Sequence, residues 1–145
     1  MPEYITVEYQ DTTTILTYNL PAQRNALREV LRQEFIAALA AFNNDKIQRA
    51  LVITGSGDRV FCAGQDLKET KNLNTENAAE WQEQLRVYTA SIRELDKPCI
   101  AAINGAATGA GFSKALLCDI RIAHADIKMG QPEINVGFQA SSVRD

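Results

Sequence analysis

Two short, almost entirely apolar runs, residues 50–54 and 99–103, constrain the fold of this chain most strongly. Each run is shorter than an ordinary helix and leads into a turn that contains glycine, which is typical of a strand inside a sheet. Each also follows a longer segment whose apolar residues recur with helical spacing. Apolar strands that alternate with amphipathic helices predict an α/β fold, in which helices bury both faces of these strands.

The other strands are predicted from alternation of apolar and polar residues. Residues 5–9 and 15–18 alternate in this way on either side of a turn, so they predict a β-hairpin. Residues 120–123 predict a further strand, and a last segment lies about Met129.

Helical spacing of apolar residues predicts three helices. They cover residues 27–42, 75–95 and 111–117. Asn25 and Thr75 are the expected N-caps of the first two, because their side chains can accept a hydrogen bond from the first helical turn.

Composition excludes several classes of function. The chain has 145 residues, of which 46% are hydrophobic, so one packed domain over residues 1–145 is expected. The 15 basic and 18 acidic residues give a net charge of −3 without a basic patch, so neither nucleic acid nor a membrane is an expected partner. No run reaches the length of a membrane span and no targeting signal is visible, so a cytoplasmic location is expected.

Cysteine and histidine usage argues against a disulfide framework and against a metal site. Cys62, Cys99 and Cys118 form no CxxC pair and have apolar neighbours, so reduced thiols are expected. His124 is the only histidine, and a surface or structural role is expected for it. No clustered spacing of ligands suggests a metal ion.

Two glycine-containing loops follow the two apolar strands. They span residues 54–66 and 104–111, and neither contains a dinucleotide-binding or P-loop motif. Loops at this position can present the free N–H groups of a helix N-terminus to a ligand, or can simply form tight turns. Both interpretations stay open from the glycines alone.

Five segments, taken in order, resemble the crotonase superfamily, which is the enoyl-CoA hydratase/isomerase family. They are RNAL at 24–27, FCAGQDLKE at 61–69, KPCIAAING at 97–105, CDIRIA at 118–123 and GQPEINVG at 130–137. The resemblance implies a spiral of repeated ββα units that binds an acyl-coenzyme A thioester. No separate cofactor is implied, because coenzyme A is part of the substrate.

The resemblance also implies an oxyanion hole, in which two backbone N–H groups stabilise the enolate of the thioester. The donors would be the N–H groups of Gln65 and Ala110, and Ala110 stands where the family usually has a glycine. Such a donor supplies about 3 kcal/mol of transition-state stabilisation. Coenzyme A contacts would fall on these residues: Arg24, Ala63, Gln65, Asp66, Lys68 and Gly109.

Several of these residues also have a structural interpretation. Arg24 and Lys68 suit coenzyme A phosphates and equally suit a solvated surface. Asp66 is expected to cap a helix, and Asp119 to form a structural hydrogen bond ahead of a strand. Trp81 is expected in the core or in the wall of an acyl tunnel.

Two glutamates transfer protons in the hydratases of this family, and this chain matches one of them. Glu133 matches the second position, whereas Ser113 occupies the first. A serine hydroxyl is too weak a base to deprotonate water unaided, so the residues favour enoyl-CoA isomerase over hydratase. Lys114 either pairs with Glu133 or reaches solvent. The alternative function is a non-catalytic remnant that binds acyl-CoA or assembles with a longer relative.

The chain stops shortly after the segment that contains Glu133. Family members continue into C-terminal helices, so the resemblance implies a core that lacks its C-terminal helical part. Family members form trimers or hexamers. Apolar surface meant for the absent part would then lie exposed, so an oligomeric or marginally stable chain is expected.

Overall fold

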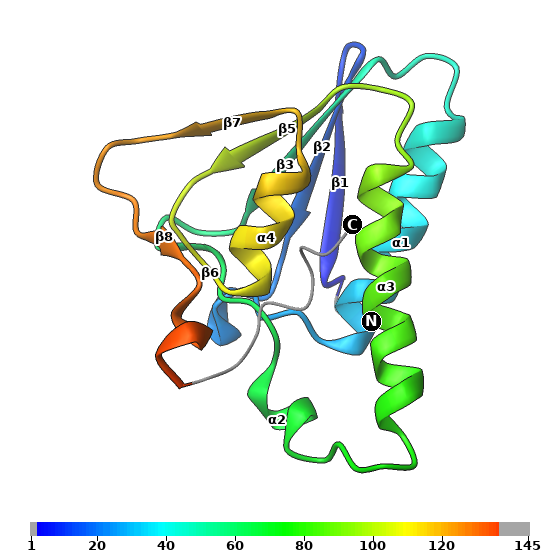
Figure 1. The fold of residues 1–145 in the computed structure, drawn as a ribbon. Coiled ribbons are helices and arrows are strands. Elements are labelled where there is room, and N and C mark those ends of the chain that lie inside the picture. The colour runs from blue at the N-terminus through cyan, green and yellow to red at the C-terminus, as the bar shows by residue number, and fades with distance from the viewer. Residues whose placement is uncertain (1–2, 137–145) are drawn as a thin grey trace.

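The computed structural model describes residues 3–136, which form two sheets and a layer of helices (Figure 1). The larger sheet has the order β1-β2-β3-β5-β7, in which β1 and β2 are antiparallel and all other pairs are parallel. Its strands are β1 (Ile5–Gln10), β2 (Thr13–Tyr18), β3 (Ala50–Gly55), β5 (Cys99–Ile103) and β7 (Ile120–Ala123). The smaller sheet is parallel and contains β4 (Val60–Cys62), β6 (Ala106–Thr108) and β8 (Met129–Gly130).

The chain repeats one supersecondary unit as it winds between the sheets. In each unit the first strand joins the larger sheet and the second joins the smaller sheet before a helix follows. The helices that close successive units are α3 (Ala78–Arg93), α4 (Ala110–Leu117) and the 3₁₀ helix η2 (Pro132–Val136). This arrangement confirms the predicted α/β spiral of ββα units.

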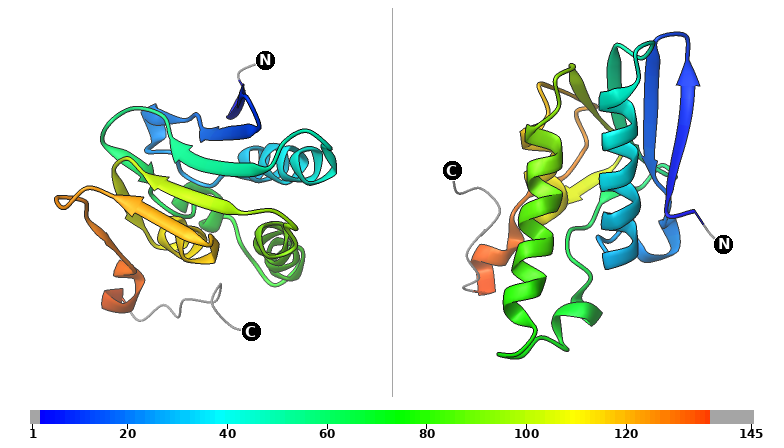
Figure 2. Two further views of the ribbon diagram at one scale, coloured as in Figure 1. Left: turned by 90° about the horizontal axis from the view of Figure 1, so that it is seen from above. Right: turned by 90° about the vertical axis from the view of Figure 1, so that its right-hand side faces the viewer.

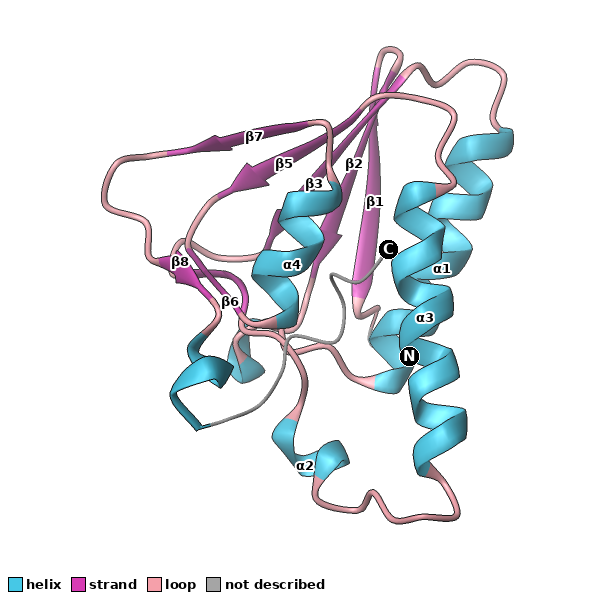
Figure 3. Cartoon of the chain, viewed as in Figure 1, coloured by secondary structure: helices cyan, strands magenta, loops and turns pink. Residues whose placement is uncertain are grey.

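The N-terminal hairpin forms its own ββα unit, in which both strands lie in the larger sheet. It is followed by η1 (Pro21–Gln23) and α1 (Glu29–Asn44), and the short α2 (Leu67–Thr70) precedes α3. Figure 3 shows α1, α3 and α4 together beside the strands. The right-hand view of Figure 2 shows α1 and α3 side by side.

An aromatic cluster fills the core between α1, α3 and the sheets. The rings of Tyr18 and Phe35 stack at 5.4 Å, and Phe61 meets Tyr18 edge-on at 5.7 Å. Phe35 also packs against Tyr88 at 5.0 Å, and the hydroxyls of Tyr18 and Tyr88 are hydrogen-bonded at 2.9 Å. Because each buried hydroxyl has a polar partner, the aromatic core leaves neither of them unsatisfied.

Burial of the strands differs from the prediction. Leu51 and Ile53 of β3 are buried, whereas Val52 between them is only half-buried, and β5 alternates in the same way. Only one face of these strands therefore packs into the core of the described chain. The prediction of burial on both faces was wrong, because an apolar run shows what a strand can bury and not what covers it.

The caps predicted for the first two long helices were both wrong. Arg28 occupies the N-cap of α1 without a side-chain cap bond, and Asn77 occupies that of α3. Asn25 lies three residues earlier than the cap of α1, in the left-handed region at φ +52°. Its side chain bonds to the backbone of other loops instead, while Thr75 precedes α3 in a turn.

The strands β4, β6 and β8 were not predicted. Each has only two or three residues, which is too short to show a periodicity in the sequence. The segment about Met129 does form β8, although it was not assigned as a strand.

Several large apolar side chains lie exposed towards the C-terminal part of the described chain. Ile120 and Ile122 of β7 are 53% and 61% exposed, and Ile134 is 79% exposed. This agrees with the expected exposure of apolar surface. Within residues 3–136 no helix is long and apolar enough to cross a bilayer. The domain expected over residues 1–145 extends beyond the described range at both ends, by residues 1–2 and 137–145.

Candidate active site

The loop of residues 63–66, called the Gln65 loop below, is held against the turn before α1. The N–H of Ala63 donates to the carbonyl of Arg24 at 3.1 Å, and the N–H of Leu27 donates to the carbonyl of Gly64 at 2.8 Å. Leu27 and Gln65 are partners in an isolated parallel bridge. The first two family-like segments, which are far apart in the sequence, therefore form one unit.

Asn25 stabilises the turn in this unit. Its carboxamide accepts from the N–H of Leu20 at 2.9 Å and donates to the carbonyl of Val60 at 2.8 Å. Arg24 and Asn25 both have positive φ, at +56° and +52°, so the chain reverses sharply here. The buried side chain of Asn25 provides the hydrogen bonds that hold this conformation.

Gly64 brings the same loop into contact with the N-terminus of α4. A β-carbon on Gly64 would lie 3.1 Å from the nitrogen of Ala110 and 2.9 Å from the carbonyl oxygen of Thr108. The hydroxyl of Thr108 donates to the carbonyl of Ala63 at 3.1 Å. Neither the N–H of Gln65 nor that of Ala110 donates to another described residue. The two predicted oxyanion donors are thus close together, and both are free to bind a ligand.

The buried guanidinium of Arg32 forms hydrogen bonds with side chains in and after this loop. Arg32, which the helical spacing places on the polar side of α1, is only 2% exposed. It donates to the carbonyl of Leu27 at 2.8 Å, to Glu69 at 3.0 Å and to the side chain of Gln65 at 3.4 Å. Glu69 also accepts from the N–H of Glu29 at 2.6 Å, so it caps α1 from α2.

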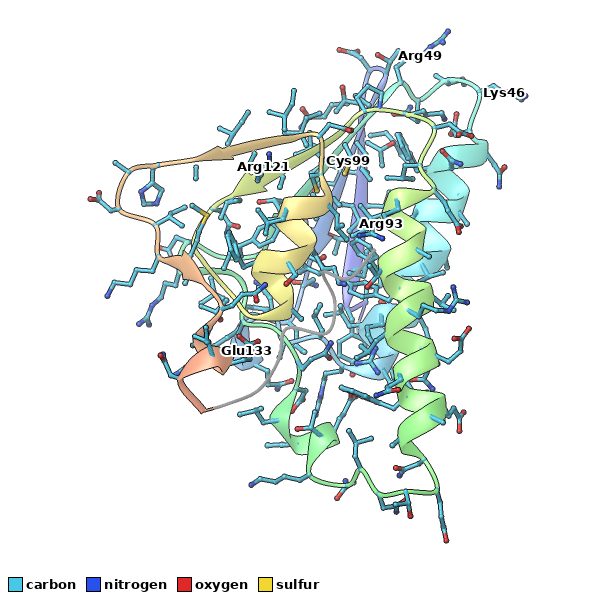
Figure 4. All side chains as sticks on the ribbon, viewed as in Figure 1. Lys46, Arg49, Arg93, Cys99, Arg121 and Glu133 are labelled. Carbon is cyan, nitrogen blue, oxygen red and sulfur yellow. The ribbon has the colours of Figure 1, made fainter. Side chains whose placement is uncertain are left out.

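The carboxylate of Glu133 lies against Gly109, at the residue before α4. A β-carbon on Gly109 would overlap Oε1 of Glu133, so the glutamate carboxylate would have to move if this residue carried a side chain. Gly109 also has φ +55°, which favours glycine for a second reason. The other oxygen of Glu133, Oε2, is buried and has no partner among residues 3–136. Figure 4 shows Glu133 near the N-terminal end of α4.

Ser113 lies one turn into α4 and is fully engaged in hydrogen bonds. Its hydroxyl donates to the carbonyl of Gly109 at 3.3 Å and accepts from the amide of Gln131 at 2.7 Å. Gln131 belongs to the same segment as Glu133. The serine therefore links α4 to the segment that delivers the glutamate, and its side chain is 2% exposed.

Lys114 neither pairs with Glu133 nor reaches solvent, which were the two predicted alternatives. It is 2% exposed, so it does not reach solvent, and its Nζ bonds to the hydroxyl of Thr89 rather than to Glu133. The same nitrogen lies 5.1 Å from the centre of the Tyr88 ring. Burial lowers the pKa of Lys114 to about 8, because no carboxylate among the described residues compensates for the lost solvation.

The residues predicted to contact coenzyme A divide into two groups. Ala63, Gln65 and Gly109 lie around the free N–H groups, whereas Arg24 and Lys68 are exposed. Asp66 accepts from the N–H of Lys68 at 2.8 Å, which confirms the predicted cap, here on α2.

Asp66 has a second partner, because its other oxygen accepts from Arg28 at 2.8 Å. Both carboxylate oxygens of Asp66 therefore form hydrogen bonds that stabilise the loop, and its contact with coenzyme A stays a prediction.

Two other predicted positions have a definite structural outcome. Asp119 accepts from the N–H of Cys99 at 2.8 Å, as predicted. Trp81 is only half-buried and lies outside the core cluster, because α3 buries Tyr88 and Ile92 instead.

A hollow of about 270 Å³ between α1 and α3 is bordered by Arg32 and Gln84 and does not include Glu133. Within the described range, no group of three metal-ligating side chains is found.

The family model described as enoyl-CoA hydratase/isomerase matches residues 8–144. The chain belongs to the enoyl-CoA hydratase/isomerase family. Curated relatives within this family include a crotonyl-CoA hydratase of Syntrophomonas wolfei, 38% identical over 94% of this chain. A 2,3-dehydroadipyl-CoA hydratase of Escherichia coli is 39% identical over 91% of the chain. The alignments cover 52% and 51% of those proteins, so the chain spans about half the length of these relatives.

Solved structures of the enoyl-CoA hydratase/isomerase family have the same fold. An enoyl-CoA hydratase from Bacillus anthracis superposes with a TM-score of 0.91 at 32% identity, over 97% of this chain and 55% of that one. An enoyl-CoA hydratase from Polaromonas sp. JS666 superposes with a TM-score of 0.85 at 39% identity, over 95% and 55% of the two chains. The crotonase-type fold and the partial coverage agree with the prediction from the sequence.

Four residues that shape the candidate site were not predicted to do so: Asn25, Arg32, Thr108 and Gln131. Asn25 and Gln131 have a sequence signal, because each stands in a family-like segment. Arg32 and Thr108 act through contacts that are distant in the sequence, so neighbouring residues give no sign of their role.

Proposed function

We propose that this chain acts on acyl-CoA thioesters by stabilising a thioester enolate, with double-bond isomerisation as its reaction. The N–H groups of Gln65 and Ala110 would donate to the thioester oxygen, and Glu133 would move the proton. The observation that carries the proposal is the buried Oε2 of Glu133, which has no hydrogen-bond partner within residues 3–136 and is held beside the start of α4. A carboxylate oxygen without a hydrogen-bond partner is available to accept a substrate proton.

The reaction needs only one carboxylate. Glu133 removes a proton from C2 of a 3-enoyl thioester, and the electron pair moves through the thioester carbonyl to its oxygen. The two N–H donors stabilise the negative charge on that oxygen, each by about 3 kcal/mol. The protonated glutamate then returns the proton to C4 as the double bond shifts to C2–C3, so no water or redox partner is consumed.

The state of Ser113 supports isomerisation over hydration. Hydration requires a group that activates water, and Ser113 stands where the resemblance places one of the two glutamates of the hydratases. Its hydroxyl already donates to Gly109 and accepts from Gln131. Neither of these two partners is a base that could deprotonate the hydroxyl, so Ser113 is suited to positioning Gln131 and not to proton removal.

Hydration is the second candidate, because the relatives favour it by name. The relatives from Syntrophomonas wolfei and Escherichia coli are both named hydratases. In that case Glu133 would activate water and also return the proton. A third alternative, acyl-CoA binding without catalysis, is supported by Ser113 at the position of one of the two hydratase glutamates.

Two substrates separate these alternatives. The purified chain is incubated with a 3-enoyl-CoA and, separately, with a trans-2-enoyl-CoA, and products are resolved by chromatography. A 2-enoyl product from the first substrate alone supports isomerisation. A 3-hydroxyacyl product from the second supports hydration, and binding without product supports the non-catalytic alternative.

Glu133→Gln tests the proton carrier. The amide keeps the shape of the side chain but cannot accept the proton, so turnover should fall by at least about 100-fold while acyl-CoA binding persists. Glu76→Gln, at an exposed position before α3, is the matched control and should keep full activity. Normal turnover of Glu133→Gln would exclude Glu133 from the reaction.

A further inference from the structure

Two of the three cysteines lie in contact, although they are 19 residues apart in the sequence. The Sγ atoms of Cys99 and Cys118 are 3.5 Å apart, and the thiol of Cys99 donates to the sulfur of Cys118. Cys99 begins β5, and Cys118 follows the last residue of α4. Both side chains are buried, so the contact belongs to the packed interior and not to a surface loop.

The backbone around the pair is held in place from both sides by Asp119. Its N–H donates to the carbonyl of Cys99 at 2.9 Å, and its carboxylate accepts from the N–H of Cys99 at 2.8 Å. From the next residue β5 and β7 pair as neighbouring parallel strands, with Ile100 opposite Ile120. This register places Cys99 beside Asp119, so Cys118 is the residue just before the partner of Cys99, and the two sulfur atoms are already in contact.

The environments of the two sulfurs differ in a way that suits a two-step thiol exchange in which Cys118 reacts first. Arg121 donates to the carbonyl of Cys118 at 2.7 Å. The hydrogen bond from Cys99 and the nearby guanidinium lower the pKa of Cys118, whereas the pKa of Cys99 is raised. Burial raises the pKa of Cys62 to about 12, so this third thiol is an internal reference of low reactivity.

We propose that Cys99 and Cys118 form a site of reversible disulfide formation, which exchanges with low-molecular-weight disulfides such as glutathione disulfide. The Cys118 thiolate attacks one sulfur of the small disulfide, which forms a mixed disulfide and releases one small thiolate. Cys99 then loses its proton to solvent, and its sulfur displaces the second small thiolate from Cys118. Two protein thiols are oxidised to one disulfide, and one small disulfide is reduced to two thiols.

The position of the two cysteines explains how a small disulfide can reach them and what their cross-link would join. β7 ends the order of the larger sheet among the described strands, and all of its residues are exposed. Local opening of this strand would admit a small disulfide to Cys118. Figure 4 places Cys99 and Arg121 at the end of α4 opposite to Glu133. The cross-link would therefore tie α4 to β5 without occupying the candidate active site.

The test uses the full chain in buffers of reduced and oxidised glutathione. Free thiols are trapped by alkylation, and a tryptic digest is examined by mass spectrometry without reduction. Cleavage after Lys114 separates the two cysteines, so their disulfide joins two peptides. We expect this joined species together with alkylated Cys62. The oxidised chain should melt about 5–10 °C higher, because the cross-link restricts the unfolded chain.

Matched variants complete the test. Cys62→Ser should keep the cross-link, while Cys99→Ser and Cys118→Ser should each lose both the joined peptides and the gain in melting temperature. The proposal is overturned if all three thiols are alkylated under buffers that oxidise the urea-unfolded chain. It is equally overturned if Cys62 enters the disulfide, or if glutathione stays on Cys118 without displacement by Cys99.

Discussion

Glu133 and Gly109 are so close that the glutamate carboxylate occupies the space a side chain on Gly109 would need. The built β-carbon would lie 2.0 Å from Oε1 and 2.9 Å from the carboxyl carbon of Glu133. Gly109 is also the last residue before α4, which presents the N–H of Ala110. The carboxylate of the proposed proton carrier therefore lies beside the residue that precedes a proposed oxyanion donor.

Gly109→Ala should therefore displace Glu133 and reduce the proposed activity by at least about 100-fold. We also expect a loss of about 1–3 kcal/mol in the free energy of unfolding, mainly from the positive φ, because the displaced carboxylate is the end of a flexible side chain. Enoyl-CoA turnover measures the first effect, and urea denaturation measures the second.

Gly57→Ala provides the control for this substitution. Gly57 also has a positive φ, at +80°, but no atom lies within 4 Å of its built β-carbon. It should lose only about 1 kcal/mol and keep its activity. Equal effects of the two substitutions would show that the contact with Glu133 has no special importance.

Ser113→Ala should leave isomerisation within about tenfold of the unmodified chain. The substitution removes the hydrogen-bond partner of Gln131 but no proton carrier, so the loss comes from a less well positioned segment. Turnover of a 3-enoyl-CoA measures the effect. A loss of about 1,000-fold or more would identify the hydroxyl as an acid or base and contradict the role proposed for Glu133.

Arg32→Met should destabilise the chain by about 2–4 kcal/mol, because Glu69 and the carbonyl of Leu27 lose a buried cationic donor. Urea denaturation measures this loss. Arg86→Met, which breaks an exposed ion pair with Glu83, should leave the stability almost unchanged, because solvent screens that pair. If the two variants were equally stable, Arg32 would not be holding the Gln65 loop.

Lys114→Met should stabilise the chain at neutral pH, by about 1–3 kcal/mol. The pKa of Lys114 falls from an ordinary value of 10.5 to about 8 in the folded chain. Below about pH 8 the folded state therefore carries the full cost of a buried charge. Between about pH 8 and 10.5 the unfolded chain binds the extra proton, so this cost decreases as the pH rises.

The difference in unfolding free energy between Lys114→Met and the unmodified chain isolates this effect from the titration of cysteines and tyrosines. It should shrink as the pH increases from about 7 to about 9.5. Lys68→Met, at an exposed position of α2, should show no such trend. A pH-independent difference for Lys114→Met would mean that its amine is neutral or well solvated in the folded chain.

Local patterns predicted some polar residues correctly and others wrongly, and the range of their interactions explains the difference. Asp66 caps α2 through the N–H two residues later, which is a contact that the local sequence can indicate. Asn25 resembles a cap equally well, but it bonds to Val60, 35 residues away. The two side chains have similar chemistry, so only the path of the chain between them and their partners decides their roles.

The same reasoning applies to the buried charges. Arg32 and Lys114 both lie on helices, where charged residues normally face solvent. Each is buried instead, because the Gln65 loop covers Arg32 and α3 covers Lys114. Periodicity describes one helix at a time and contains no information about what packs against it.

The sequence by itself determined the family, the α/β class and the order of the longer strands and helices, because periodicity and family-like segments are properties of neighbouring residues. It also singled out Gln65, Ala110, Ser113 and Glu133. Only the tertiary structure decided that Gly64 brings the Gln65 loop to the start of α4, and that Glu133 lies against Gly109 with one oxygen that no other described residue contacts by a hydrogen bond. The physical reason is that these contacts depend on how strands from distant parts of the chain pair and on how closely their connecting loops can approach.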